Sequence, residues 1–198
     1  GMRKKILFLA GMMACCSLAG TQEISKTWVA DKGNGTYQNP VLHADYSDPD
    51  VCAAGDDFYM TASSFNCIPG IPILHSNDLV NWSLVNYALP VQEPEEFFDK
   101  AQHGKGVWAP AIRFHNGEFY IYWGDPDYGI YMIKTKDPKG KWSKPVLVKA
   151  GKGMIDATPL WDEDGKVYLI HAYAGSRSGV NSILVICELN PEGTEVIS

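Results

Sequence analysis

The segment Asn116-Gly117-Glu118-Phe119-Tyr120-Ile121 and two similar segments determine the expected fold. Each has a pair of turn residues, one polar residue, and then a tyrosine between two apolar residues. This order is typical of a tight hairpin turn that leads into a β-strand. The other two segments are Gly55-Asp56-Asp57-Phe58-Tyr59-Met60 and Asp164-Gly165-Lys166-Val167-Tyr168-Leu169. The three tyrosines are 61 and 48 residues apart, which indicates a repeated unit of about 50 residues.

Each repeated unit continues into further strand-like runs, and no segment keeps the apolar spacing of an amphipathic helix. The runs are Ile73–Ser76 and Asn77–Trp82, Ile130–Ile133 and Asp137–Trp142, and Ser182–Cys187. Four short strands per unit are typical of a β-propeller blade, and the recurring order favours blades over an antiparallel sandwich. Three units fit in this sequence, whereas propellers close with four or more blades. The sequence therefore predicts an all-β, incomplete propeller domain.

The strand that precedes each hairpin carries the candidate chemistry. Asp48 lies eleven residues before Tyr59, while Trp108 and Asp156 each lie twelve residues before their own tyrosines. We therefore predict that these three are equivalent positions at the start of the innermost strands, where they converge on one end of the channel. Two carboxylates can do acid/base work, and an indole can pack against a sugar ring. The alternatives are ordinary turn roles for the aspartates and core packing for Trp108.

The first residues predict export. A basic segment, Arg3-Lys4-Lys5, precedes an uncharged run that ends in small residues at Gly20, which is typical of a signal peptide over residues 1–20. Gly1, ahead of Met2, is interpreted as a cloning remnant. The pair Cys15-Cys16 leaves a lipoprotein-type signal open. We expect the protein in the periplasm or as an outer-membrane lipoprotein of a bacterium, with membrane contact only through an N-terminal lipid.

The charge of the chain argues against polyanionic partners. The formal net charge is −6, and it becomes −9 when the three basic residues of the signal segment are removed. Nucleic acids and anionic membrane surfaces favour clusters of Lys and Arg, and no two of these residues stand next to each other after Lys5. Residues 21–36 are interpreted as a linker, and residues 37–198 as the incomplete propeller domain.

Cysteine and acidic residues do not form a familiar metal or disulfide pattern. The irregular spacing of Cys52, Cys67 and Cys187 favours three small buried hydrophobes over a Cys52–Cys67 bridge. The segment Asp125-Pro126-Asp127-Tyr128-Gly129 lacks the alternating ligands of a calcium-binding loop and is interpreted as a hairpin turn. The residues therefore predict no metal ligands and no required cofactor.

Several motifs together resemble the opening of glycoside hydrolase family 43. They follow one another in the family's order from Asn39 to about Leu169: Asn39-Pro40-Val41-Leu42, Tyr46-Ser47-Asp48-Pro49-Asp50-Val51, Gly55-Asp56-Asp57-Phe58-Tyr59, Ser63-Ser64-Phe65, His75–Trp82, Gly106-Val107-Trp108-Ala109-Pro110 and Ile155-Asp156-Ala157-Thr158-Pro159. The resemblance implies a five-bladed propeller, of which this chain supplies about the first three blades. It also implies hydrolysis of arabinofuranosides or xylosides with inversion, and leaves open the axial calcium ion that some relatives carry.

The resemblance also implies roles for individual residues. Asp48 would be the general base, and Asp156 the carboxylate that tunes and orients the general acid. Phe65 and Trp108 would line the subsite for the terminal sugar. The family's acid is a glutamate on the next blade, beyond Ser198, so this chain alone is predicted to be inactive. Asp48 has to stay ionised, so we expect it to be partly buried and to accept hydrogen bonds.

Two other functions stay open at this point. One is a non-catalytic carbohydrate-binding propeller that uses the same pocket, and the other is an endo-arabinanase of the same family. The segment 65–72 resembles the loop of exo-acting members, which favours an exo-acting α-L-arabinofuranosidase or β-xylosidase. The expected partner is an oligosaccharide that contains arabinose or xylose.

Overall fold

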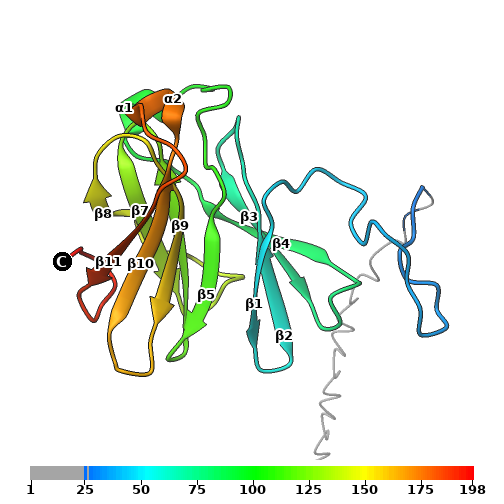
Figure 1. Cartoon of the computed structure of the whole chain (residues 1–198). Helices are drawn as coiled ribbons and strands as arrows, with labels where there is room; N and C mark the ends of the chain where they lie inside the picture. Colours follow the sequence, from blue (N-terminus) through cyan, green and yellow to red (C-terminus); the bar gives the residue numbers. More distant parts are fainter. Residues whose placement is uncertain (1–24, 26) are drawn as a thin grey trace, which may run out of the picture.

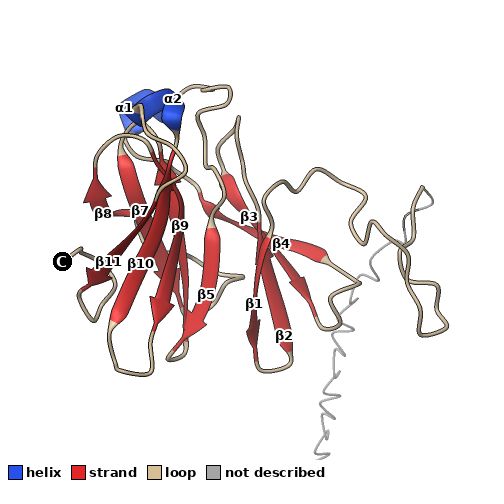
Figure 2. Ribbon diagram, viewed as in Figure 1, coloured by secondary structure: helices blue, strands red, loops and turns tan. Residues whose placement is uncertain are grey.

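The computed structural model describes residue 25 and residues 27–198, and it is built from three antiparallel sheets (Figures 1 and 2). Sheet 1 consists of β1 (Asp50–Ala54), β2 (Asp57–Thr61), β3 (Gly70–Ser76) and β4 (Ser83–Leu89). Sheet 2 consists of β5 (Ala111–His115), β6 (Glu118–Asp125), β7 (Gly129–Thr135) and β8 (Val146–Ala150). Sheet 3 consists of β9 (Met154–Trp161), β10 (Val167–Tyr173) and β11 (Leu184–Leu189). The predicted all-β class and the order of the strand units are confirmed.

The three repeated tyrosine motifs form the β1–β2, β5–β6 and β9–β10 hairpins, as predicted. In the first two hairpins, a glycine with positive φ occupies the two-residue turn: Gly55 at +64° and Gly117 at +78°. Short hairpin turns need such a conformation, because it matches the twist of the flanking strands. Two short helices, α1 (Glu95–Phe98) and α2 (Gly175–Ser178), lie in the longer connections.

Strand β6 joins the two halves of the hydrophobic core. Phe119, Ile121 and Trp123 belong to a buried cluster with sheet 1, whereas Tyr120 and Tyr122 belong to a cluster with sheet 3. Successive side chains of a strand point to opposite faces, so β6 is buried on both sides between its neighbours. Each large apolar side chain removed from water contributes about 1.5–3 kcal/mol to stability. The sheets therefore stack face to face in chain order.

The first strands of the sheets lie next to one another. Contacts join β1 to β5 and β5 to β9, and all three strands begin at the end of the molecule where α1 and α2 lie (Figure 1). We call this end the loop face; it is formed by residues 45–49 ahead of β1, by residues 62–69, 90–110, 126–128, 151–153 and 174–183, and by the first residues of β9. The starts of these three first strands therefore lie close together.

The cysteines differ from the prediction at one position. Cys52 and Cys187 are buried, but Cys67 is exposed on the loop face, and all three thiols are free. The interpretation as three buried hydrophobes is therefore wrong for Cys67, which lies in an irregular loop rather than in a strand. A Cys52–Cys67 disulfide is not formed.

The predicted signal segment, residues 1–20, lies outside the described residues. Asp31, in the predicted linker, forms a β-bridge with Tyr37, the first residue of the predicted domain, and the Asn81 side chain donates a hydrogen bond of 2.9 Å to the Asp31 carboxylate. This segment is therefore attached to sheet 1. No helix among the described residues has the length and apolar character needed to cross a membrane.

Candidate active site

Three of the four sequence-predicted residues lie where the first strands begin. Asp48 precedes β1, Trp108 precedes β5, and Asp156 lies near the start of β9. Phe65 lies in the loop between β2 and β3. The loop face therefore collects all four residues, although they are spread over more than 100 positions of the sequence.

The strand pairing corrects one predicted equivalence. Each repeated tyrosine pairs with a residue of the preceding strand. In all three hairpins, the residue four positions before that partner has a positive φ. Those residues are Asp48 (φ +51°), Ala109 (φ +37°) and Asp156 (φ +56°). Ala109, and not Trp108, is thus the counterpart of the two aspartates. The prediction compared the number of residues between each candidate and its tyrosine. That number depends on the length of the turn, and the third hairpin has a five-residue turn whereas the first two have two-residue turns.

The shared backbone conformation is itself unusual. Positive φ is uncommon for residues other than glycine, and such strained positions cluster at functional sites. Its recurrence in three sheets indicates that the turn belongs to the repeated architecture. The identity of the side chain at this turn then decides whether a sheet presents a carboxylate.

Asp48 presents an ionisable group that is held in place by hydroxyl groups. It is exposed, and its Oδ2 accepts hydrogen bonds from Ser47 Oγ (3.0 Å) and Ser63 Oγ (2.7 Å). Ser63 Oγ in turn accepts a hydrogen bond from the backbone N–H of Ala109 (2.8 Å). The expectation of accepted hydrogen bonds is confirmed, but Asp48 is more exposed than expected. Ser63 was not predicted as a site residue, although it lies in the quoted Ser63-Ser64-Phe65 motif.

Asp156 interacts electrostatically with Asp48. Desolvation by the surrounding protein, followed by the negative charge of Asp48, raises the pKa of Asp156 above its usual value of 3.8. The Asp156 side chain nevertheless keeps an exposed surface. The two carboxylates therefore lie close enough to repel each other when both are ionised, as the predicted convergence requires.

A short backbone ladder holds Phe65 next to Trp108. Ser64 and Val107 exchange two backbone hydrogen bonds of 2.9 Å, and Gly106 N–H donates to the Phe65 carbonyl at 2.9 Å. A Cβ on Gly106 would lie 2.2 Å from the Ser64 carbonyl oxygen, so only glycine permits this approach. We call residues 63–65 and 106–109 the aromatic clip; both of its aromatic side chains are half-buried.

Two further acidic residues near this face have structural roles. Asp50 Oδ2 accepts hydrogen bonds from Ile112 N–H (2.8 Å) and the Arg113 guanidinium (2.5 Å), which join sheet 1 to sheet 2. Asp125 Oδ1 accepts hydrogen bonds from the backbone of Asp127 and Tyr128, so the predicted hairpin turn is confirmed. Among the described residues, no group of three His, Cys, Asp or Glu side chains is arranged to hold a metal ion.

Comparison with protein families identifies one match over most of the chain. The model described as glycosyl hydrolases family 43 matches residues 37–198. A β-xylosidase of Formosa agariphila is 35% identical over 191 residues, which cover 89% of this chain and 32% of that enzyme. A non-reducing end α-L-arabinofuranosidase of Bacteroides ovatus is 37% identical over 139 residues, which cover 68% of this chain and 26% of that enzyme.

Solved structures give the same result. The crystal structure of a GH43_12 protein retrieved from a capybara gut metagenome matches with a TM-score of 0.66 and 33% identity, over 80% of this chain and 30% of that one. The GH43 protein BlXynB from Bacillus licheniformis matches with a TM-score of 0.66 and 31% identity, over 82% of this chain and 32% of that one. The chain spans about a third of the length of the curated relatives it matches.

Proposed function

Because the chain belongs to glycosyl hydrolase family 43, we propose that it is the N-terminal part of an inverting, exo-acting glycosidase. The enzyme releases a terminal arabinofuranose or xylose from plant polysaccharide fragments. Its catalytic domain is a five-bladed propeller to which sheets 1 to 3 contribute the first three blades. The names of the relatives, β-xylosidase and non-reducing end α-L-arabinofuranosidase, support exo action on pentosides.

Asp48 is the general base of this proposal. The observation that carries it is the exposed carboxylate, which accepts hydrogen bonds from two serine hydroxyls and whose charge, after desolvation, contributes to the raised pKa of Asp156. An ionised carboxylate can take a proton from water as that water attacks the anomeric carbon. The hydrogen bonds from Ser47 and Ser63 hold this carboxylate in a fixed position, where a base has to be to reach the attacking water.

Asp156 is the carboxylate that tunes the general acid. In an inverting glycosidase, the acid and the base stand roughly 6.5–9.5 Å apart, which leaves room for the attacking water. A further carboxylate near the acid raises the pKa of that acid, so that it still carries a proton near neutral pH. The acid itself is a glutamate that lies outside this chain, and the chain alone is therefore inactive.

Phe65 and Trp108 form the wall of the subsite for the terminal sugar. The aromatic clip fixes both residues through the backbone, and Trp108 Nε1 donates a hydrogen bond of 2.9 Å to the Gly104 carbonyl. This bond sets the plane of the indole. Aromatic faces pack well against the C–H face of a sugar ring, and rigid placement lowers the entropic cost of binding.

We also propose that the protein is exported, either to the periplasm or to the outer membrane through a lipid on Cys15 or Cys16. Cell fractionation of the native host tests this. Enrichment in the cytoplasm would contradict it, and loss of membrane association in the variant with both cysteines changed to Ser would support lipidation.

The catalytic proposal is tested by following the hydrolysis of arabino- and xylo-oligosaccharides by NMR with the complete polypeptide. We expect release of a monosaccharide from the non-reducing end, first seen as the anomer opposite to that of the substrate. Internal cleavage products would instead indicate an endo-acting enzyme. Binding of the oligosaccharides without any turnover would indicate a carbohydrate-binding propeller.

A further inference from the structure

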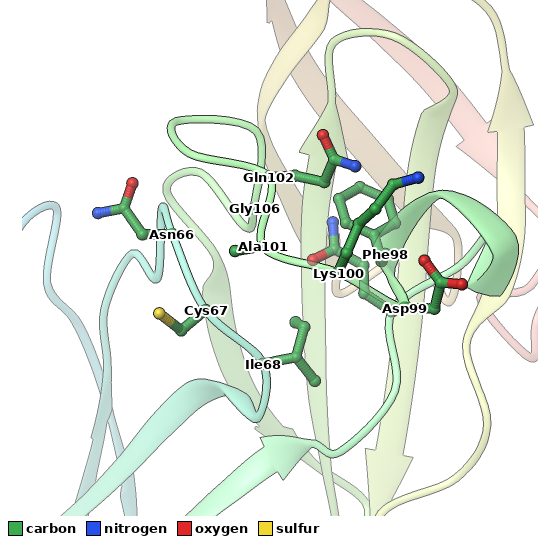
Figure 3. A pocket seen from close by; sticks show the side chains of 10 residues that line it. Asn66, Cys67, Ile68, Phe98, Asp99, Lys100, Ala101, Gln102 and Gly106 are labelled. Atoms are coloured by element: carbon green, nitrogen blue, oxygen red, sulfur yellow. The ribbon is translucent and has the colours of Figure 1, made fainter.

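A cavity of about 200 Å³ lies beside the aromatic clip (Figure 3). Asn66, Cys67 and Ile68 of the β2–β3 loop line one side, and Phe98 with residues 99–102 lines the other. A water molecule takes about 30 Å³ of liquid volume, so the cavity has room for roughly seven waters. That is the scale of a single monosaccharide ring and is smaller than a typical pocket for a drug-sized ligand.

The cavity shares its wall with the proposed sugar subsite. Asn66 directly follows Phe65, and Gly106 lines the cavity two residues before Trp108. Asn66 Oδ1 accepts a hydrogen bond from Gly104 N–H (2.9 Å), and the Gly104 carbonyl accepts one from the Trp108 indole (2.9 Å). The loops around the cavity are thus fixed by the same contacts that position the aromatic clip.

Gln92 is the most deeply buried polar side chain that lines the cavity. It is only 1% exposed, and within the part of the chain that the structure describes neither Nε2 nor Oε1 has a hydrogen-bond partner. Gln92 does lie near Asp125, whose pKa is raised by burial and only slightly lowered again by the Gln92 amide, but the two groups do not meet in hydrogen-bond geometry. Buried amides without partners are rare in folded proteins, because leaving such a group unsatisfied is costly.

The chemistry of the lining fits a neutral, hydroxyl-bearing ligand. An amide donates from Nε2 and accepts at Oε1, which matches a hydroxyl group that also donates and accepts. Ile68 and the buried Phe98 supply an apolar surface for the C–H groups of a ring. At the rim, Asp99 and Lys100 are exposed and carry opposite charges, so the lining gives no net preference for an ion.

We propose that this cavity is an additional saccharide subsite, which binds one pentose unit other than the one being hydrolysed and anchors it through the Gln92 amide. The inference rests on the proposed function, which supplies the substrate. Occupation of the cavity adds affinity for longer or branched saccharides and not for an aryl pentoside, which carries a single sugar.

Kinetics of the complete polypeptide test the subsite. The ratio of kcat/KM for a branched arabinoxylo-oligosaccharide to that for an aryl pentoside is expected to fall ~10-fold in Gln92→Met, which keeps the volume of the side chain and removes its hydrogen bonds. Ala101→Phe, at an exposed position that lines the cavity, should lower the ratio as well by filling the space. The matched control Ala150→Phe, on the exposed edge of β8, should leave the ratio unchanged. Unchanged ratios in both cavity variants would overturn the proposal.

The exposed thiol of Cys67 provides a second readout that is independent of turnover. Xylo- or arabino-oligosaccharide should slow the alkylation of Cys67 by iodoacetamide, followed by peptide mapping, and Gln92→Met should abolish this protection. Protection without any hydrolysis by the unmodified enzyme would support the subsite while contradicting the catalytic proposal. Hydrolysis without protection would overturn the subsite alone.

Discussion

The chain has a similar backbone conformation ahead of β1 and β5 but carries different side chains there. Asp48 and Ala109 both have positive φ, both precede a proline, and both bind the same hydroxyl group of Ser63. Only the side chain differs: sheet 1 presents a carboxylate, and sheet 2 presents a methyl group. The repeated fold thus supplies a backbone turn of positive φ in each sheet, and the side chain at that turn decides whether the sheet carries a reactive group.

The strongest test of this comparison moves the carboxylate from one sheet to the other. In the complete polypeptide, Asp48→Ala should lower kcat on an aryl pentoside by about 10²–10⁴-fold, the usual contribution of a general base. The double variant Asp48→Ala/Ala109→Asp should be as inactive as the single variant, because the new carboxylate starts from a different point on the face. Recovery of substantial activity in the double variant would contradict the assignment of the base to one position.

Sheet 2 does carry a carboxylate at this face, but it is buried. Asp125 is 2% exposed, and burial raises its pKa from 3.8 to about 6. The folded state therefore favours the protonated form, and the resulting stabilisation is full below pH 3.8 and lost as the pH rises through about 6. The loss amounts to about 3 kcal/mol at 1.36 kcal/mol per pKa unit.

Asp125→Asn should remove this pH dependence while keeping the hydrogen bonds to the backbone of Asp127 and Tyr128. Urea unfolding at pH 4 and pH 8 measures the effect as the difference between variant and unmodified protein. The control Asp127→Asn breaks a half-exposed ion pair with Arg177 and should change stability by less than about 1 kcal/mol. Equal pH slopes for the unmodified protein and Asp125→Asn would show that burial of Asp125 has no such effect.

A smaller effect is expected from the hydroxyl group that links the two sheets. Ser63→Ala removes one hydrogen bond from Asp48 and leaves the Ala109 N–H without a partner, so we expect about 10-fold lower kcat and about 1–2 kcal/mol lower stability. Ser47→Ala is the matched control, because Ser47 donates to Asp48 but does not reach Ala109. Its loss of stability should be smaller than that of Ser63→Ala, as measured by thermal unfolding.

The smallest effect concerns the conformation itself. Ala109→Gly removes the strain of a positive φ in the folded state but increases the conformational entropy of the unfolded chain. These effects oppose each other, so the free energy of unfolding should change by no more than about 1 kcal/mol. Ala111→Gly, two residues later in β5, lacks a positive φ to relieve and should destabilise the protein. If Ala109→Gly proved more destabilising than Ala111→Gly, the strain attributed to position 109 would be disproved.

Much of this arrangement could be predicted from the sequence, because hairpin turns and tyrosine-centred strands have local signatures. The convergence of Asp48 and Asp156 followed from the register of those strands. The counterpart of these aspartates in sheet 2 was misassigned because turn length varies between repeats. The bridging contact of Ser63 and the burial of Gln92 depend on how irregular loops pack, and such packing leaves no periodic pattern in the chain.

The most direct test of the central claim is the turnover number of Asp48→Asn in the complete polypeptide, measured together with its affinity for the oligosaccharide. Asn keeps the size of the side chain but removes the base, so we predict a loss of about 10²–10⁴-fold in kcat with affinity retained. Asp56→Asn, at the opposite end of β1, should behave like the unmodified enzyme. Turnover by Asp48→Asn within a few-fold of the unmodified enzyme would contradict the account.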